Sequence, residues 1–235
     1  MRKSPFTILE LLLVISIGAV MLTVALPAFN RMLKGSASGV AIRELTARLS
    51  SARSKAMSNG SHRVAIVFPA NEDCSATAAD FNRRYRYRAY RACYVNESDL
   101  TFVKWVDGDN WKFLPEGIVL EAKTGSPQEV IHLHETSDEK KATSTELHSS
   151  SETLECHIGG RSYSEDSKKV SFRNFILFNK NGTLDKFPNG VVLRLREGKV
   201  KDDGSEVTTG TQNEYFPIVI RATGKIKAYN ELVKG

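Results

Sequence analysis

The chain has 235 residues, 41% of them hydrophobic and 26% charged, which allows one membrane helix and one globular domain large enough to bury a core. Its net charge of +6 is compatible with a nucleic-acid or anionic-lipid partner, and it also suits an ordinary solvated surface. The three cysteines, Cys74, Cys93 and Cys156, allow at most one disulfide and lack the spacing of a metal site.

The only segment apolar enough to enter a bilayer runs from Phe6 to Phe29, and Glu10 is its single ionisable residue. About 20 predominantly apolar residues are what a helix needs to cross the hydrocarbon core. We therefore predict a leader over residues 1–5 and a transmembrane helix over residues 6–29. The cations Arg2 and Lys3 favour a cytoplasmic N-terminus, although cations soon after the run weaken this asymmetry.

Three interpretations of the apolar run compete. A cleaved secretory signal needs a small-residue site at its end, which Thr23-Val24-Ala25 supplies, but the helical pattern continues beyond it. A plain signal anchor explains the length but gives no reason for Glu10, because an ionised glutamate in hydrocarbon costs kilocalories per mole and calls for a partner. Alternatively, Glu10 lies shallow enough to reach the lipid headgroups.

The residues from Phe6 to Leu12, FTILELL, resemble the processing and methylation signature of type IV pilins and of the pseudopilins of type II secretion. Its usual form is Gly-Phe-Thr-Leu-Ile-Glu-Leu, and the closing Pro27-Ala28-Phe29 matches this family as well. The resemblance implies that a prepilin peptidase cuts between Pro5 and Phe6 and methylates the new amine. Pro5 departs from the pattern, since the residue before the cut is normally glycine and proline restricts the backbone.

The resemblance also implies a partner for Glu10. In assembled family members the carboxylate meets the N-terminal amine of a neighbouring subunit, here that of Phe6. Two opposite charges buried in lipid are each costly alone, so pairing them favours one axial register between packed helices. Glu10 is then an assembly residue. The other implied partners are pilin or pseudopilin subunits, a prepilin peptidase and an inner-membrane assembly platform.

Beyond the apolar run we expect the helix to continue over residues 30–60. Pro27 should kink it, because proline lacks the N–H group and clashes with the carbonyl one turn earlier. Apolar residues then recur at steps of three and four with charged residues between them. This pattern predicts an amphipathic helix that lays one face on a domain, with Leu45 and Leu49 in the core. Asn59-Gly60 is a stop signal.

A basic and aromatic stretch follows the first predicted strand. Arg84, Arg86 and Arg88 alternate with Tyr85 and Tyr87, which on a strand places the guanidinium groups on one face and the tyrosines on the other. One interpretation is a surface that contacts nucleic acid, as in a DNA-binding minor pilin used for DNA uptake. The interpretation that we favour is a sheet strand with inward tyrosines and solvated arginines.

Residues 61–235 form the predicted soluble β-rich domain. Within it, residues 135–169 are rich in Ser, Thr, Glu and Lys and predict a flexible insertion. Outside the insertion, short strand-forming segments lie between turn residues, and the last two form a hairpin. The predicted strands are His62–Phe68, Thr101–Val106, Trp111–Phe113, Ile118–Ala122, Val170–Phe178, Gly190–Arg196, Pro217–Ala222 and Lys225–Tyr229.

Two turn glycines, Gly182 and Gly224, occur in the segment Phe178–Thr183 and in the C-terminal hairpin. These segments resemble the C-terminal region of a pilin subfamily that includes the type II secretion H subunit and the FimT pilins. The glycines carry this resemblance.

Motifs for catalysis are absent from the sequence. It has no Gly-rich phosphate loop, no nucleophile elbow and no helical HExxH pair. His132 and His134 would share one face of a strand, but no further residue supplies metal-ligand spacing. We therefore predict no enzymatic activity, no metal and no cofactor.

Together these patterns predict an α+β fold in which a long N-terminal helix, transmembrane in its first half, packs on a C-terminal antiparallel β domain. The expected protein is a minor pilin-like subunit of a type II secretion pseudopilus or type IV pilus, held in the bacterial inner membrane with its domain in the periplasm. A membrane-anchored periplasmic domain that never assembles is the alternative of another class.

Overall fold

A computed structural model describes residues 8–70, 85–106, 110–122, 130–133, 154–158, 168–185, 187–200, 207–209 and 214–234. The chain divides into two compact units, Met1–Ala37 and Ser38–Gly235. The architecture is α+β, with one long N-terminal helix followed by antiparallel strands, as the sequence predicts.

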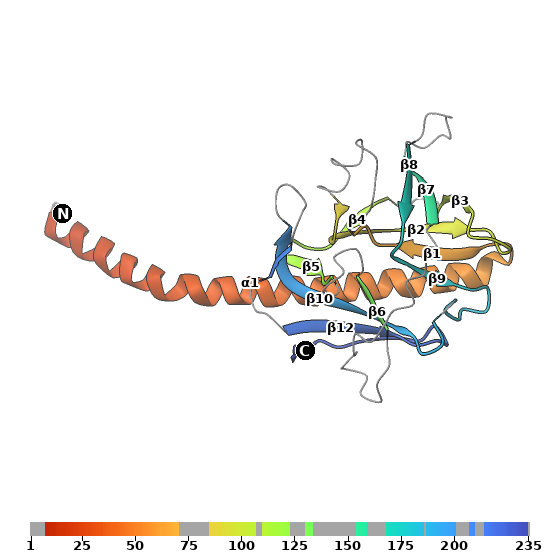
Figure 1. The fold of residues 1–235 in the computed structure, drawn as a ribbon. Coiled ribbons are helices and arrows are strands. Elements are labelled where there is room, and N and C mark those ends of the chain that lie inside the picture. Colours follow the sequence, from red (N-terminus) through yellow and green to blue (C-terminus); the bar gives the residue numbers. More distant parts are fainter. Residues whose placement is uncertain are drawn as a thin grey trace, which may run out of the picture. The chain divides into compact units, whose positions relative to one another are not determined.

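Helix α1 spans Ile8–Asn59, and Figure 1 shows its course. The helix is continuous through position 27 and ends at Asn59, within the predicted stop signal Asn59-Gly60. Leu45 and Leu49 are fully buried, which confirms that one face of the amphipathic part lies in the core. The same face includes Ala41, Ala52 and Ala56, all at most 2% exposed. Within the described part of the chain, no helix has the length and apolar character needed to cross a membrane.

The first sheet has the strand order β3-β2-β1-β9, and β4 also pairs with β2. All of these pairings are antiparallel. Strands β1, β3 and β4 lie inside predicted strands, since short runs rich in β-branched and aromatic residues specify them locally. The bounds are β1 Arg63–Val67, β2 Ala89–Val95, β3 Phe102–Trp105, β4 Lys112–Phe113 and β9 Phe175–Phe178.

One face of this sheet is covered by a separate antiparallel pair, β7 (Leu154–Ile158) and β8 (Lys168–Phe172). Leu154 and Cys156 are fully buried in one apolar cluster with Ala65 of β1. The prediction of a flexible insertion over residues 135–169 is therefore wrong for β7 and for the start of β8. Leu154 and Cys156 alternate with polar residues, so they place apolar side chains on one face of a short strand that the first sheet then buries.

The second sheet is built around the long strand β10, Val191–Val200. Its order is β11-β10-β12-β13, with β5 and β6 pairing to β10 and β14 to β12. Figure 1 shows β10 and β12 running beside each other, as their register requires. The C-terminal hairpin β12–β13 confirms the predicted one. The bounds are β5 Ile118–Leu120, β6 Ile131–Leu133, β11 Val207–Thr209, β12 Glu214–Ile220, β13 Ile226–Ala228 and β14 Val233–Lys234.

The backbone around Tyr87 joins the two sheets. Its N–H donates to the carbonyl of Pro69 at 2.8 Å, and its carbonyl accepts from Leu120 of β5 at 2.7 Å. Tyr87 has a φ of 58° and is 1% exposed. Strand β2 therefore begins only at Ala89, and the predicted strand through Arg86 and Arg88 is wrong. The reason is tertiary, because this backbone bonds to two segments that are distant in sequence from each other.

Candidate functional site

The N-terminal half of α1 exposes a dense set of large apolar side chains. Their hydroxyl-bearing neighbours are satisfied within the helix, since Ser16 Oγ donates to the Leu13 carbonyl at 2.8 Å and Thr23 Oγ1 donates to the Val20 carbonyl at 2.7 Å. A soluble monomer rarely exposes so continuous an apolar surface, which marks it as a region that another phase or protein covers. The exposed apolar residues are Ile8, Leu9, Leu11, Leu12, Leu13, Val14, Ile15, Ile17, Val20, Met21 and Leu22.

Glu10 lies in the first turn of α1, within this apolar surface, and its side chain is exposed. A carboxylate near the N-terminus of a helix is favoured by the helix dipole. Pro5 and Phe6, the predicted cleavage site, lie outside the described residues. Pro27 lies within α1, and the predicted kink there remains a prediction.

The C-terminal half of α1 has two opposite faces. Opposite the buried stripe, an exposed stripe recurs at steps of three and four residues, as expected for one side of a helix. Most of its side chains are small, which permits close approach of another helix. The stripe consists of Ser36, Val40, Arg43, Ala47, Ser50, Ser54 and Met57.

Arg53 ties the end of α1 to two turns of the β domain. Its Nε donates to the carbonyl of Gly182 at 2.9 Å, and its Nη2 donates to the carbonyl of Thr223 at 3.2 Å. The two turn glycines of the subfamily resemblance therefore meet beneath this side chain. A Cβ on Gly224, whose φ is +75°, would lie 1.8 Å from the Gly182 carbonyl oxygen. Only glycine permits this approach.

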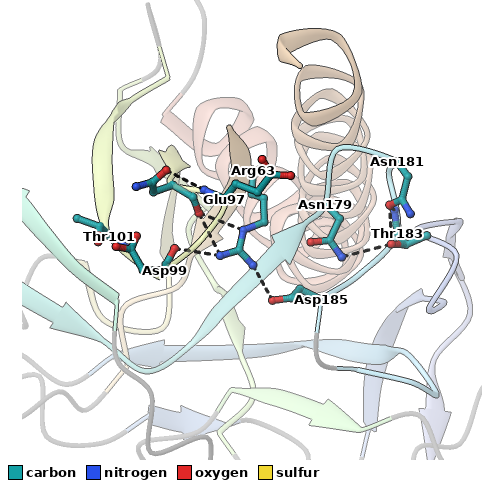
Figure 2. Close-up of polar contacts among 9 residues, drawn as sticks. Arg63, Glu97, Asp99, Thr101, Asn179, Asn181, Thr183 and Asp185 are labelled. Carbon is teal, nitrogen blue, oxygen red and sulfur yellow. Dashed lines mark hydrogen bonds and ion pairs between the residues drawn. The ribbon is translucent and has the colours of Figure 1, made fainter. Parts of the chain in front are cut away.

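A second arginine, Arg63 at the start of β1, contacts two further segments, and Figure 2 shows this network. Its guanidinium donates to the carbonyls of Asn96 and Asp99 at 3.0 Å and to Asp185 Oδ2 at 3.0 Å. The Asp99 carboxylate in turn accepts from the Thr101 backbone at 3.1 Å, and hydrogen bonds from Thr101 hold the pKa of Asp99 below its usual value. Arg63 thereby orders the β2–β3 turn.

The neighbouring turn after β9 is closed by its own polar side chains. Asn181 Oδ1 accepts from the backbone of Thr183 at 3.0 Å and from its hydroxyl at 2.7 Å. Lys180 forms an ion pair with Glu97 of the β2–β3 turn. Because this pair is largely exposed, it adds little stability. These contacts position the turn that Arg53 holds.

A buried ionic centre lies on the second sheet and was not predicted. Glu121, 9% exposed, follows β5, and its Oε1 accepts from Arg196 Nη2 at 2.6 Å. Arg194 Nη1 lies 3.7 Å from the same oxygen. Among the described residues, Glu121 Oε2 has no hydrogen-bond partner. Burial raises the pKa of Glu121, and the charges of Arg196 and Arg194 partly oppose this rise. The alternation of Arg194 and Arg196 is the only sequence signal for this centre.

The ionic centre predicts a pH-dependent stability. Because the folded pKa of Glu121 lies above the usual value of 4.5, the folded chain holds the proton more tightly than the unfolded chain. The stabilisation is present below pH 4.5 and is lost as pH rises through the folded pKa. We expect the unfolding free energy of the wild type, minus that of Glu121→Gln, to fall with rising pH in denaturant titrations.

The control variant for this measurement is Glu116→Gln, which changes an exposed carboxylate in the turn directly before β5. A difference between wild type and Glu121→Gln that rises with pH would show that the arginines, not burial, dominate the site.

The predicted arginine surface is not formed as expected. Arg86 is 6% exposed, and its Nε donates to the Ala70 carbonyl at 3.2 Å. Arg88 is half-buried, with Cζ 6.0 Å from the centre of the Phe113 ring. Arg84 lies outside the described residues. Arg86 and Arg88 therefore do not share one solvated strand face.

No group of three or more metal-ligating side chains occurs among the described residues. His132 is buried, with Nε2 3.3 Å from the Glu121 carbonyl, and His134 lies outside the described residues. Cys93 and Cys156 are buried thiols in the cluster between the first sheet and β7–β8. Cys74 also lies outside the described residues, so pairing with it remains a prediction.

No protein-family model and no curated protein matches the chain. Solved structures of pilin-class proteins are similar to it. A structure of the minor pseudopilin EpsH from the type 2 secretion system of Vibrio cholerae aligns with 11% identity and a TM-score of 0.37, over 82% of this chain and 95% of that one. Another crystal structure of EpsH from Vibrio cholerae aligns with 11% identity and a TM-score of 0.40, over 85% of this chain and 96% of that one.

The type IV minor pilin FimU of Pseudomonas aeruginosa aligns with 12% identity and a TM-score of 0.38, over 81% of this chain and 87% of that one.

Proposed function

We propose that the chain is a minor pilin-like subunit of a type II secretion pseudopilus or a type IV pilus. The observation that carries the proposal is the apolar first half of α1, with its exposed large side chains and the single carboxylate Glu10, directly within the FTILELL signature. The role is structural. In this proposal α1 is the assembly element, and the β domain of each assembled subunit is exposed to partner subunits.

In the proposed resting state, residues 6–29 lie in the inner membrane with the β domain in the periplasm. The exposed apolar side chains from Ile8 to Leu22 support this, because lipid is the phase in which such a surface is stable. The hydroxyls of Ser16 and Thr23 are already bonded inside the helix, so they do not oppose insertion.

In the proposed assembled state, the same surface packs against helices of neighbouring subunits. Glu10 then pairs with the amine of Phe6 in an adjacent subunit, and this pairing selects one axial register. The exposed stripe of small side chains between Ser36 and Met57 supports helix contacts over the second half of α1 as well. The assembly platform is the proposed partner during transfer from membrane to filament.

Processing by a prepilin peptidase is the first test. We expect that the membrane-extracted chain, co-expressed with the peptidase, begins at Phe6 and is one methyl group heavier than the cut chain. Intact mass spectrometry measures both changes. Pro5→Gly restores the usual residue before the cut, so we expect it to be processed at least as completely as the wild type.

Expression without the peptidase is the control and should leave Met1–Pro5 in place. If both the wild type and Pro5→Gly keep their leader in the presence of peptidase, the amine of Phe6 never forms. The chain would then be an anchored periplasmic domain and not an assembling subunit.

A further inference from the structure

Met57, in the last turn of α1, is a sulfur-bearing side chain that solvent reaches in the folded chain. It is 45% exposed, whereas Cys93 and Cys156 are fully buried. In the described part of the unit Ser38–Gly235 it is the only exposed side chain that contains sulfur. Oxidation of a thioether requires that the oxidant reach the sulfur atom. Met57 is therefore the described side chain of this unit most open to oxidation at sulfur.

The same thioether packs on the turn that follows β9. A Cβ built on Gly182 would lie 2.7 Å from Met57 Sδ and 3.1 Å from its Cγ, so the Met57 side chain occupies the space beside this glycine. The N–H of Gly182 closes the turn by donating to the carbonyl of Asn179 at 2.8 Å. Met57 is thus exposed on one side and in contact with a tight turn on the other.

Arg53 lies beside Met57 over the same glycine. The two residues are four positions apart on α1 and so share a helix face. Arg53 Nε would lie 3.1 Å from the same Cβ position, and it donates to the Gly182 carbonyl at 2.9 Å. Its Nη2 donates to the Thr223 carbonyl at 3.2 Å. A charged donor that holds both turns is therefore a neighbour of the Met57 sulfur.

We propose that Met57 is a reversible oxidation site, whose sulfoxide draws Arg53 away from the turns at Gly182 and Gly224 and loosens their attachment to α1. The oxidant is hydrogen peroxide. The sulfur lone pair attacks one peroxide oxygen and the O–O bond breaks. The departing hydroxide takes the proton from the transferred oxygen and leaves as water. Sulfur loses two electrons, and the peroxide gains them. This modification goes beyond the proposed assembly role and does not rest on it.

The sulfoxide changes two contacts at once. It replaces an apolar thioether by a polar group, which weakens the packing on Gly182. Its oxygen is also a strong acceptor beside the guanidinium of Arg53, and hydrogen bonds from a charged donor are among the strong ones. The sulfoxide oxygen therefore competes with the Gly182 carbonyl for Arg53 Nε. Reduction of the sulfoxide by methionine sulfoxide reductases restores the thioether and both contacts.

The test uses the full-length chain in detergent micelles, treated with dilute hydrogen peroxide. Peptide mass spectrometry should find one added oxygen atom at Met57 while the chain stays folded. Hydrogen–deuterium exchange in residues 179–185 and 221–225 should then become about tenfold faster, because these turns open more often. Exchange in residues 191–195 of β10 should not change. Treatment with methionine sulfoxide reductases A and B, which act on the two sulfoxide epimers, should return exchange to its starting rate.

Two variants separate the site from its surroundings. Met57→Leu is the matched control, because it keeps the volume and apolar character but cannot form a sulfoxide. Its exchange rates should not respond to peroxide. Arg53→Gln tests the route through the guanidinium. Exchange at both turns should already be faster before treatment, and oxidation should add less than about twofold, because effects that pass through one group are not additive.

Near-ultraviolet circular dichroism checks that each variant is folded. If Arg53→Gln does not fold, the comparison of wild type with Met57→Leu still decides the outcome.

Four results would overturn the proposal. The first is that Met57 in the folded chain resists peroxide that oxidises it in the unfolded chain. The second is that the oxidised wild type exchanges at the untreated rate. The third is an equal acceleration in Met57→Leu, which would assign the effect to another residue. The fourth is a full tenfold acceleration in Arg53→Gln. None of them bears on Glu10 or on filament assembly, since the unassembled chain is measured.

Discussion

Replacing Glu10 by leucine is expected to remove the chain from assembled filaments while leaving it in the membrane. The substitution makes the apolar segment more hydrophobic, so insertion should be retained. It also leaves the amine of Phe6 in a neighbouring subunit without its proposed partner. Removing one member of a buried ion pair costs about 3–5 kcal/mol, which exceeds a hundredfold in an assembly equilibrium.

The measurement is the fraction of the chain recovered with sheared filaments from cells that contain the assembly machinery, compared with the fraction in the membrane. Glu10→Asp is the matched control, because it keeps the charge and shortens the side chain by one methylene. We expect Glu10→Asp to assemble better than Glu10→Leu. Wild-type recovery of Glu10→Leu in filaments would exclude the pairing with Phe6.

Substitution of Gly224 by alanine is expected to have the largest effect on the stability of the β domain. A left-handed backbone costs a residue with a Cβ about 1–2 kcal/mol. At Gly224 the new Cβ would also overlap the Gly182 carbonyl oxygen, at 1.8 Å, and approach Arg53 Nε at 2.8 Å. The two turns must separate, and Arg53 must lose at least one of its carbonyl contacts. We expect a total loss of about 3 kcal/mol or more.

Gly117→Ala is the matched control for this effect. Gly117 has a φ of +86°, but a Cβ there would meet no atom within 4 Å, so only the backbone strain of about 1–2 kcal/mol applies. Denaturant unfolding followed by the fluorescence of Trp105 and Trp111 measures both variants. Equal losses in the two variants would show that the turns at Gly182 and Gly224 separate without cost.

The sequence by itself determined the long helix and most of the strands. The helix could be predicted because its signals are local: an uninterrupted apolar run, then buried positions such as Leu45 and Leu49 at steps of three and four residues. The strand β1 and the hairpin β12–β13 have equally local signals in their β-branched and aromatic residues and, for the hairpin, a turn glycine. The candidate assembly residue Glu10 stands out because one carboxylate in an apolar run is costly.

Only the tertiary structure determined where the observed backbone conformation differs from the one that the local sequence pattern predicts. The alternation around Tyr87 predicts a strand, yet its backbone bonds to Pro69 and Leu120 and adopts a positive φ. The polar composition around β7 predicts a loop, yet Leu154 and Cys156 are buried against the first sheet. In both places the decisive partner is distant in sequence, and contacts between distant segments override local preference because they bury apolar surface and satisfy backbone hydrogen bonds.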